Sequence, residues 1–391
     1  MKIIKLSLIA SLTISSAIAG GDIVPMPPPL VEERATTVSG KLQAYYYTFD
    51  NFGTGDLFSD TTGQLGTAVT LDISHKLFEG VTLNFSATGF SNLMDKGGYM
   101  EGTATGGYMN IANITASYWD TTLIAGRQLL DTPMLGSFDW LLAPSSFEAV
   151  TIKNNSIENL TLVTSYVTKI RENNDWNSNG NTFTDLTANS QNNYAVGAVY
   201  ANENLFDASV WYYNIDSSFA TANLDKYTQI YTDLGISYAG VKLEGQYVMT
   251  DYAGAGVTDA SAFGAKLSTT IYDIALSAAY VQVVDNVTGY VGVDSLYTSS
   301  WNTFASWAYD STTNKDASTY KVDASTKIYG VDMEVSYAGY NDKGSEVDVI
   351  LGYDVTDAFS LGAIYTSTDY DTGTDFLDAD NAIEIIATYT F

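Results

Sequence analysis

The chain has 391 residues and a formal net charge of −28, from 17 Lys and Arg against 45 Asp and Glu, with no cysteine and one histidine. Nucleic acid is excluded as a partner, because a phosphate backbone is bound by a basic surface that this chain lacks. Because the chain has no cysteine, disulfides and thiolate metal sites are also excluded. Only 16% of residues are charged, while Tyr and Gly are abundant. This composition is typical of β-proteins whose strands alternate aromatic and small polar residues.

The first residues have the features of a secretory signal. Lys2 and Lys5 precede a short apolar run, and Ala17-Ile18-Ala19 supplies the small residues of a cleavage site. We therefore expect residues 1–19 to be removed on export. Residues 20–37, which hold four of the six prolines, are expected to form an extended periplasmic lead-in before a folded domain of residues 38–391.

From residue 38 onward, apolar residues recur at every second position. The run 331–337 is a clear case, and such runs indicate strands with one face in an apolar environment and one face in water. Short connections such as 79–80 alternate with long ones such as 94–110 and 285–318. About eighteen strands are predicted, near 38–47, 66–78, 81–93, 111–119, 121–128, 148–154, 160–169, 193–201, 205–214, 225–239, 241–250, 260–270, 272–284, 319–329, 331–340, 345–354, 359–368 and 382–391.

This pattern predicts an all-β fold, a transmembrane antiparallel β-barrel with short periplasmic turns and long outer loops. A soluble secreted β-sandwich or propeller is the alternative, because those folds show the same alternation. The last strand favours the barrel. It ends on Phe391, with Tyr389 two positions earlier on the same face. These two residues resemble the signal by which outer-membrane proteins are recognised for assembly.

The stretch 111–171 carries the strongest indication of function. A strand ending in Gly126-Arg127-Gln128 is followed by an acidic loop with two prolines, and then by an L-L-x-P-x-x-F-E return at residues 141–148. The pattern resembles the OprD-type porins and the related Campylobacter-type major outer-membrane porins of Gram-negative bacteria. The resemblance implies an 18-stranded barrel, usually trimeric, whose third long loop, residues 129–147 here, folds inward to narrow the pore. The apolar composition of that loop also favours packing over exposure to water.

Charged residues beside this loop are expected to line the constriction. The candidates are Arg127, Asp131, Asp139, Glu148, Lys153 and Arg171, with Lys169 beside them. The basic residues would then face the acidic ones, and opposed charges across a narrow pore create a transverse field. In the alternative, Arg127 and Arg171 pair with nearby loop acids and only brace the loop.

Acids on the polar phase of the strands are expected to line the lumen. They are Asp72, Asp323, Asp332, Glu334, Asp348 and Glu384. Together with the excess of negative charge, they lead to the hypothesis of a cation-preferring channel for passive diffusion of ions and small hydrophilic solutes. A substrate-specific channel for small amino acids or carboxylates is the alternative within the same class.

No cofactor is expected except a structural Ca²⁺, which the resemblance to Campylobacter-type porins suggests. Asp131, Asp139 and Glu148 are its candidate ligands, since calcium prefers carboxylate oxygens. The expected partners are outer-membrane lipid, lipopolysaccharide, the barrel assembly machinery and further copies of the chain in a homotrimer.

Two functions of other classes compete with a channel. An outer-membrane hydrolase needs a histidine base, and His75, the single histidine, is expected on the outward face near a short turn. We therefore expect no enzyme activity. A surface adhesin built on the barrel would use the aromatic side chains of the long loop 285–318. We expect those side chains to pack over the pore mouth instead.

Overall fold

The computed structural model describes residues 35–50, 55–94, 106–139, 141–172, 182–187, 192–202, 206–217, 226–310, 313, 315–370 and 381–391. The expected signal, residues 1–19, and most of the expected lead-in lie outside this part of the chain. The strands described are β1 (Thr36–Phe49), β2 (Gln64–Phe78), β3 (Val81–Asn92), β4 (Gly106–Tyr118), β5 (Thr121–Gln128), β6 (Ser146–Ile157), β7 (Leu160–Arg171), β8 (Thr184–Asp185), β9 (Asn193–Ala201), β10 (Phe206–Asp216), β11 (Lys226–Tyr238), β12 (Val241–Tyr252), β13 (Ala260–Ile271), β14 (Ile274–Val284), β15 (Ala317–Ile328), β16 (Val331–Tyr340), β17 (Gly344–Thr356), β18 (Phe359–Tyr370) and β19 (Asn381–Thr390).

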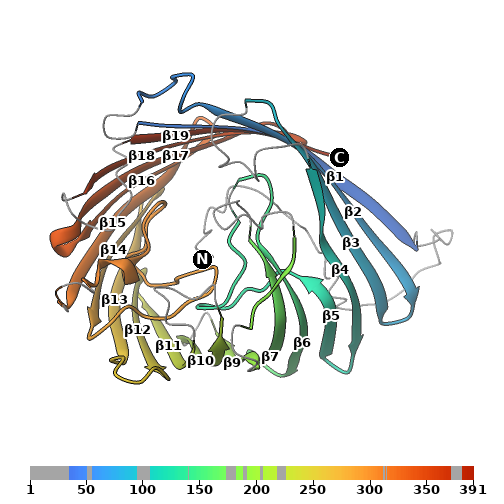
Figure 1. The fold of residues 1–391 in the computed structure, drawn as a ribbon, viewed down its shortest axis with the longest axis horizontal. Helices are drawn as coiled ribbons and strands as arrows, with labels where there is room; N and C mark the ends of the chain where they lie inside the picture. The colour runs from blue at the N-terminus through green and yellow to red at the C-terminus, as the bar shows by residue number, and fades with distance from the viewer. Residues whose placement is uncertain are drawn as a thin grey trace.

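All of these strands belong to one antiparallel sheet that closes on itself (Figure 1). Closure comes from β1 and β19, which pair from Lys41 opposite Thr390 to Phe49 opposite Ala382. The two-residue strand β8 pairs only with β7, beside the closed ring. The barrel therefore has eighteen strands, which confirms the fold predicted from the alternation.

Helical structure is limited to short turns in the described part of the chain. Two 3₁₀ turns are present, η2 (Ala305–Ala308) and η3 (Asn341–Lys343). No helix among the described residues is long and apolar enough to cross a membrane.

The barrel strands alternate between an outward and an inward side chain, as β12 shows. Leu243, Tyr247 and Met249 are exposed on the outer surface, whereas Gln246 and Val248 point inward and are buried. An outer surface of this kind suits lipid, and polar groups are then confined to the lumen phase and the loops. The low content of charged residues follows directly from this division.

Several of the tight turns hold aromatic side chains beyond the ends of the strands. Trp119, Tyr272 and Tyr329 have φ angles of 46°, 53° and 50°. Two-residue turns with positive φ match the twist of paired strands, although a bulky residue in this conformation costs about 1–2 kcal/mol. The three side chains are 93%, 94% and 99% exposed. They project from one rim of the barrel, where amphipathic rings favour the membrane interface.

The aromatic residues of the strands divide into two groups. Tyr238, Tyr337 and Tyr389 are exposed on the outer surface, where they suit the membrane interface. Tyr45 and Trp211 point inward and are buried. Their alternate phase, rather than their place near a strand end, decides which side of the sheet they occupy.

The C-terminus completes the closing pair of strands. Phe391 and Gly40 exchange two backbone hydrogen bonds of 3.0 Å. A Cβ on Gly40 would lie 2.4 Å from the carbonyl oxygen of Thr70 and 2.6 Å from the Phe391 ring. Glycine at this position therefore allows the last residue to pack against the first strand. The role of Phe391 and Tyr389 as an assembly signal stays a prediction.

Gly40→Val should destabilise the barrel by about 1–3 kcal/mol, because a larger side chain overpacks the closing pair. The midpoint of urea unfolding and the fraction of compact barrel in unheated SDS gels measure this. Gly89→Val is the matched control, since no atom lies within 4 Å of the position a Cβ would take there. Equal losses in both variants would show that the closing contact has no special importance.

Candidate functional site

Two long loops fold into the barrel and contact each other. We call them L3 (residues 129–145, between β5 and β6) and L7 (residues 285–316, between β14 and β15). The N–H of Gly136 donates to the carbonyl of Val291 at 3.1 Å, and the N–H of Val291 donates to that of Met134 at 2.9 Å. Figure 1 shows segments from both parts of the chain inside the ring. L3 lies where the sequence predicts, whereas L7 enters the lumen instead of only covering the pore mouth.

Apolar side chains hold L3 against its surroundings. Met134, Leu141 and Leu142 are at most 3% exposed, and the latter two pack with Tyr45 and Ile364 of the barrel wall. Burying one such side chain stabilises the folded loop by about 1.5–3 kcal/mol. The loop therefore folds inward because its sequence is too apolar for an extended conformation in water. Trp140 lies outside the described residues.

Arg171 fastens the return of L3 to the barrel. Its side chain is fully buried, and its Nη1 donates to the carbonyl oxygen of Pro144 at 3.0 Å. The guanidinium carbon lies 3.3 Å from the centre of the Tyr108 ring, a cation–π contact. Arg171 thus braces the return of L3 through a backbone carbonyl and an aromatic ring, and it is absent from the described residues that line the cavity.

Arg127, Glu148 and Lys169 form an ion-pair cluster away from the lumen. The Nε of Arg127 lies 3.0 Å from Oε1 of Glu148, and the Nζ of Lys169 lies 3.6 Å from Oε2. The three residues are direct neighbours on β5, β6 and β7, and Glu148 shares the outward phase of β6 with the exposed Val150. Lys153 lies further along β6, towards the tight turn at 158–159. The expected basic wall is therefore not assembled at the constriction.

A cavity of about 1970 Å³ occupies the lumen between L3, L7 and the strands. Asp131 and Asp139 line it, whereas Arg127, Glu148, Lys153 and Arg171 are absent from the described residues that do so. Among the described residues, eleven carboxylates border this cavity against four lysines. The acids are Asp72, Asp131, Asp139, Asp207, Asp233, Glu244, Asp294, Asp323, Glu334, Asp348 and Asp357, and the bases are Lys41, Lys242, Lys266 and Lys321.

Of the six lumen acids expected from the alternation, four border the cavity, Glu384 is buried beneath Trp301, and Asp332 lies elsewhere on the same phase. Asp72, Asp323, Glu334 and Asp348 border the cavity. Asp332 is on the same phase but lies near a tight turn, where it pairs with Lys327 at 3.0 Å. The phase of a residue therefore predicts its side of the sheet, but not its height in the pore.

The lysines that line the cavity are not among the site residues predicted from the sequence. Lys242 lies 2.7 Å from Glu244 and 3.1 Å from Asp207, so its charge is shared with two acids. Lys266 lies opposite Glu244 on the neighbouring strand, and Lys321 extends the basic group to β15. The signal that would have found them is the same alternate phase that identified the acids.

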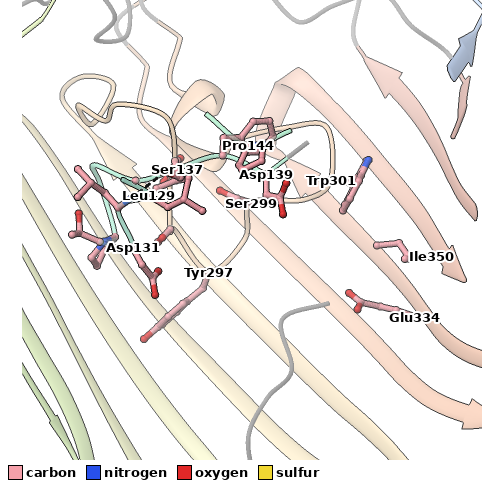
Figure 2. Close-up of a pocket in the computed structure, with 18 of the residues that line it drawn as sticks. Leu129, Asp131, Ser137, Asp139, Pro144, Tyr297, Ser299, Trp301, Glu334 and Ile350 are labelled. Atoms are coloured by element: carbon pink, nitrogen blue, oxygen red, sulfur yellow. Dashed lines mark hydrogen bonds between the residues drawn. The ribbon is translucent and has the colours of Figure 1, made fainter. Parts of the chain in front are cut away.

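Asp139 of L3 is an acid at the constriction whose pKa is raised. Burial raises the pKa of the Asp139 carboxyl to about 6, and the positive charge of Lys41 acts in the opposite direction. Figure 2 shows Asp131 and Asp139 on L3 beside Tyr297 and Trp301 of L7, with Glu334 and Ile350 on the barrel wall. The narrow part of the lumen is thus built from both loops, and part of its charge titrates near neutral pH.

A family model described as outer membrane porin, OprD family, matches residues 61–347. The chain belongs to the OprD family of porins. A porin of this family is a channel rather than an enzyme, and it resides in the outer membrane of Gram-negative bacteria. The resemblance seen in residues 111–171 is therefore confirmed.

Solved porin structures share this fold at low sequence identity. Acinetobacter baumannii OccAB3 is 16% identical, with a TM-score of 0.72, over 91% of this chain and 99% of its own. Pseudomonas aeruginosa OccK9 (OpdG) is 18% identical, with a TM-score of 0.73, over 91% and 98%. P. aeruginosa OccD3 (OpdP) is 15% identical, with a TM-score of 0.70, over 92% and 91%. No curated protein sequence matches the porin.

The porin does not bring the expected calcium ligands together. Asp131 and Asp139 border the cavity, but Glu148 pairs with Arg127 outside it. Within the described residues, no group of three or more Asp, Glu or His side chains is arranged to hold a metal ion. His75 lies on the outer phase of β2, with Nδ1 2.7 Å from the Thr36 hydroxyl, a position that suits an interfacial residue.

The cation-to-anion permeability ratio of the porin should decrease as the pH falls from about 7 to about 5, because the Asp139 carboxyl, with a pKa of about 6, becomes neutral over this interval. The charge of Lys41 then loses its nearest opposing charge on L3. Reversal potentials measured across a salt gradient at each pH test this. Asp139→Asn should flatten that part of the profile, and an unchanged profile in the variant would contradict the assignment.

Arg171→Ala should loosen L3 by about 2–4 kcal/mol, because it removes a hydrogen bond from a charged donor and a cation–π contact. Faster proteolysis within residues 129–145 and unsteady single-channel current are expected. Arg127→Ala is the control, since Arg127 pairs with Glu148 outside the lumen. If the two variants behave alike, the arginines do not differ in role as their contacts indicate.

Proposed function

We propose that this porin is a cation-preferring diffusion channel for ions and small hydrophilic solutes. The observation that carries the proposal is the excess of carboxylates over lysines on the lumen cavity, eleven against four. Charged groups that line a narrow aqueous pore concentrate ions of the opposite sign. A cation therefore meets a favourable potential along the lumen, and an anion meets an unfavourable one.

A row of oxygen-bearing side chains on the inner wall supports this proposal. The row crosses three strands: Asp323 of β15 lies opposite Ser336 of β16, and Ser336 lies opposite Asp348 of β17. The hydroxyl of Ser277 donates to Asp323, and that of Ser336 donates to Asp348 at 3.0 Å. Carboxylate and hydroxyl oxygens are suitable ligands for a partly dehydrated cation.

Replacing two acids of the cavity, Asp323→Asn with Glu334→Gln, should lower the cation-to-anion permeability ratio on the order of twofold, because two of the charges on the cavity are removed. Reversal potentials in a KCl gradient give this ratio. Asp332→Asn is the matched control, because Asp332 is outside the cavity lining and pairs with Lys327. Anion preference in the unmodified porin would overturn the proposal.

A substrate-specific channel for small amino acids or carboxylates is the second candidate. It is favoured by the lysines of β12, β13 and β15, which share the cavity with the acids and offer both signs of charge to a zwitterion. Liposome swelling with sugars, lysine and pyruvate separates the candidates. Rates that depend on solute size and charge alone support diffusion, whereas a strong preference for one solute supports specificity.

An adhesin is not supported by the position of L7. Tyr290, Phe304 and Trp307 pack against one another inside the barrel, with ring centres 5.1 and 5.2 Å apart in successive pairs. These aromatic side chains therefore pack against one another within the protein. The homotrimer, the contacts with lipopolysaccharide, the assembly machinery and bound calcium stay predictions.

A further inference from the structure

L7 is held in the pore by acids of the barrel wall. Glu346, at the start of β17, accepts the backbone N–H of Asn302 at 2.7 Å through one carboxylate oxygen. Its other oxygen accepts the hydroxyl of Thr303 at 2.5 Å and that of Tyr370 at 3.3 Å. Both oxygens of this carboxylate are thus committed to hydrogen bonds, and two of the three donors belong to L7.

Trp301, the preceding residue of L7, is held at two further points. Its indole Nε1 donates to Glu384 of β19 at 2.7 Å, and its backbone N–H donates to Asp348 of β17 at 3.3 Å. The hydroxyl of Tyr45 donates to the second oxygen of Glu384. The indole borders the lumen cavity, and Figure 2 shows it above Ile350 of the wall.

The three acids are almost completely enclosed. Glu346 is fully buried, and Asp348 and Glu384 are each 2% exposed. A carboxyl group that is withdrawn from water needs hydrogen-bond partners for its oxygens, because a buried oxygen without a partner destabilises the folded state. Residues 301–303 form neither helix nor strand, so the wall supplies the acceptors that regular structure would otherwise provide.

This attachment differs from that of L3. Leu141 and Leu142 fix L3 mainly by apolar burial, and Arg171 adds a single charged anchor. The segment 301–303 of L7 also packs Trp301 against the apolar cluster that contains Leu141 and Leu142, but it adds several hydrogen bonds to acids of the wall. Loss of one acceptor should therefore loosen the segment 301–303, while the apolar contacts of L3 and of the rest of L7 are kept.

We propose that Glu346, Asp348 and Glu384 are positioning residues that fix L7 as a second constriction element, and that Trp301 is the residue whose ring limits the size of the solutes that pass. The proposal rests on the proposed function as a diffusion channel. It assigns to three of the barrel's acids a role in pore geometry, and of these only Asp348 also borders the cavity.

Glu346→Leu and Glu384→Leu test the positioning role, because each removes the acceptors at similar side-chain volume. Single-channel conductance should rise about twofold and fluctuate between levels, and liposome swelling should admit larger sugars. Asp332→Leu is the control, since it loses a lumen-phase carboxylate without a contact to L7 and should keep a single steady level. Glu384→Gln retains an acceptor oxygen for the indole and should stay closer to the unmodified conductance than Glu384→Leu.

Trp301 variants test the size limit. Trp301→Ala should enlarge the range of sugars that pass, whereas Trp301→Phe keeps a ring but loses the Nε1 donor. The double variant Trp301→Phe with Glu384→Leu should pass about the same range of sugars as either single variant, because both changes remove the same hydrogen bond.

Conductance equal to the control in Glu346→Leu and Glu384→Leu, or an unchanged sugar limit in Trp301→Ala, would overturn the proposal. If Glu346→Leu does not yield a heat-modifiable barrel, Glu384→Leu and Trp301→Phe still decide the question. Failure of the channel function itself has a different signature, since the unmodified porin would then show no conductance.

Discussion

Every backbone N–H and C=O group within the lipid layer must find a partner inside the protein, and in this porin the pairing of β1 with β19 completes that requirement. A closed sheet leaves no unpaired edge and forces successive side chains to opposite sides. The outer phase then becomes apolar, and polar groups are directed into the lumen. The scarcity of charged residues and the concentration of acids on the inner wall are two results of the same constraint.

The two inward loops meet this polar wall in different ways. L3 brings its own apolar side chains, so the lumen near Leu142 resembles a small hydrophobic core. L7 brings backbone donors and an indole, and these bind acids of β17 and β19. The acids of the barrel wall consequently have two roles, one at the aqueous cavity and one in holding L7. Asp323 and Glu334 border the aqueous cavity, whereas Glu346 is enclosed beneath L7.

The sequence predicted most of the fold because a period of two is a local property, and it predicted L3 because that loop is too apolar for water. It failed for Arg127, since both phases of β5 carry an apolar residue, Leu123 and Ile124, and alternation alone does not decide between them. A shift in the register of β6 with β7 beside Glu148 also interrupts the alternation, so the side of the sheet on which Lys169 lies could not be predicted. The entry of L7 depends on contacts with residues such as Glu384, 83 positions away from Trp301, which no local pattern records.

The joining of the first and last strands also has a kinetic consequence. Gly40 and Phe391 lie near opposite ends of the described chain, so their hydrogen bonds close a loop that contains all the intervening hairpins. Contacts of such long sequence separation carry the largest loss of chain entropy and slow the folding of β-proteins. Until this loop closes, two strand edges stay open to pairing with other chains.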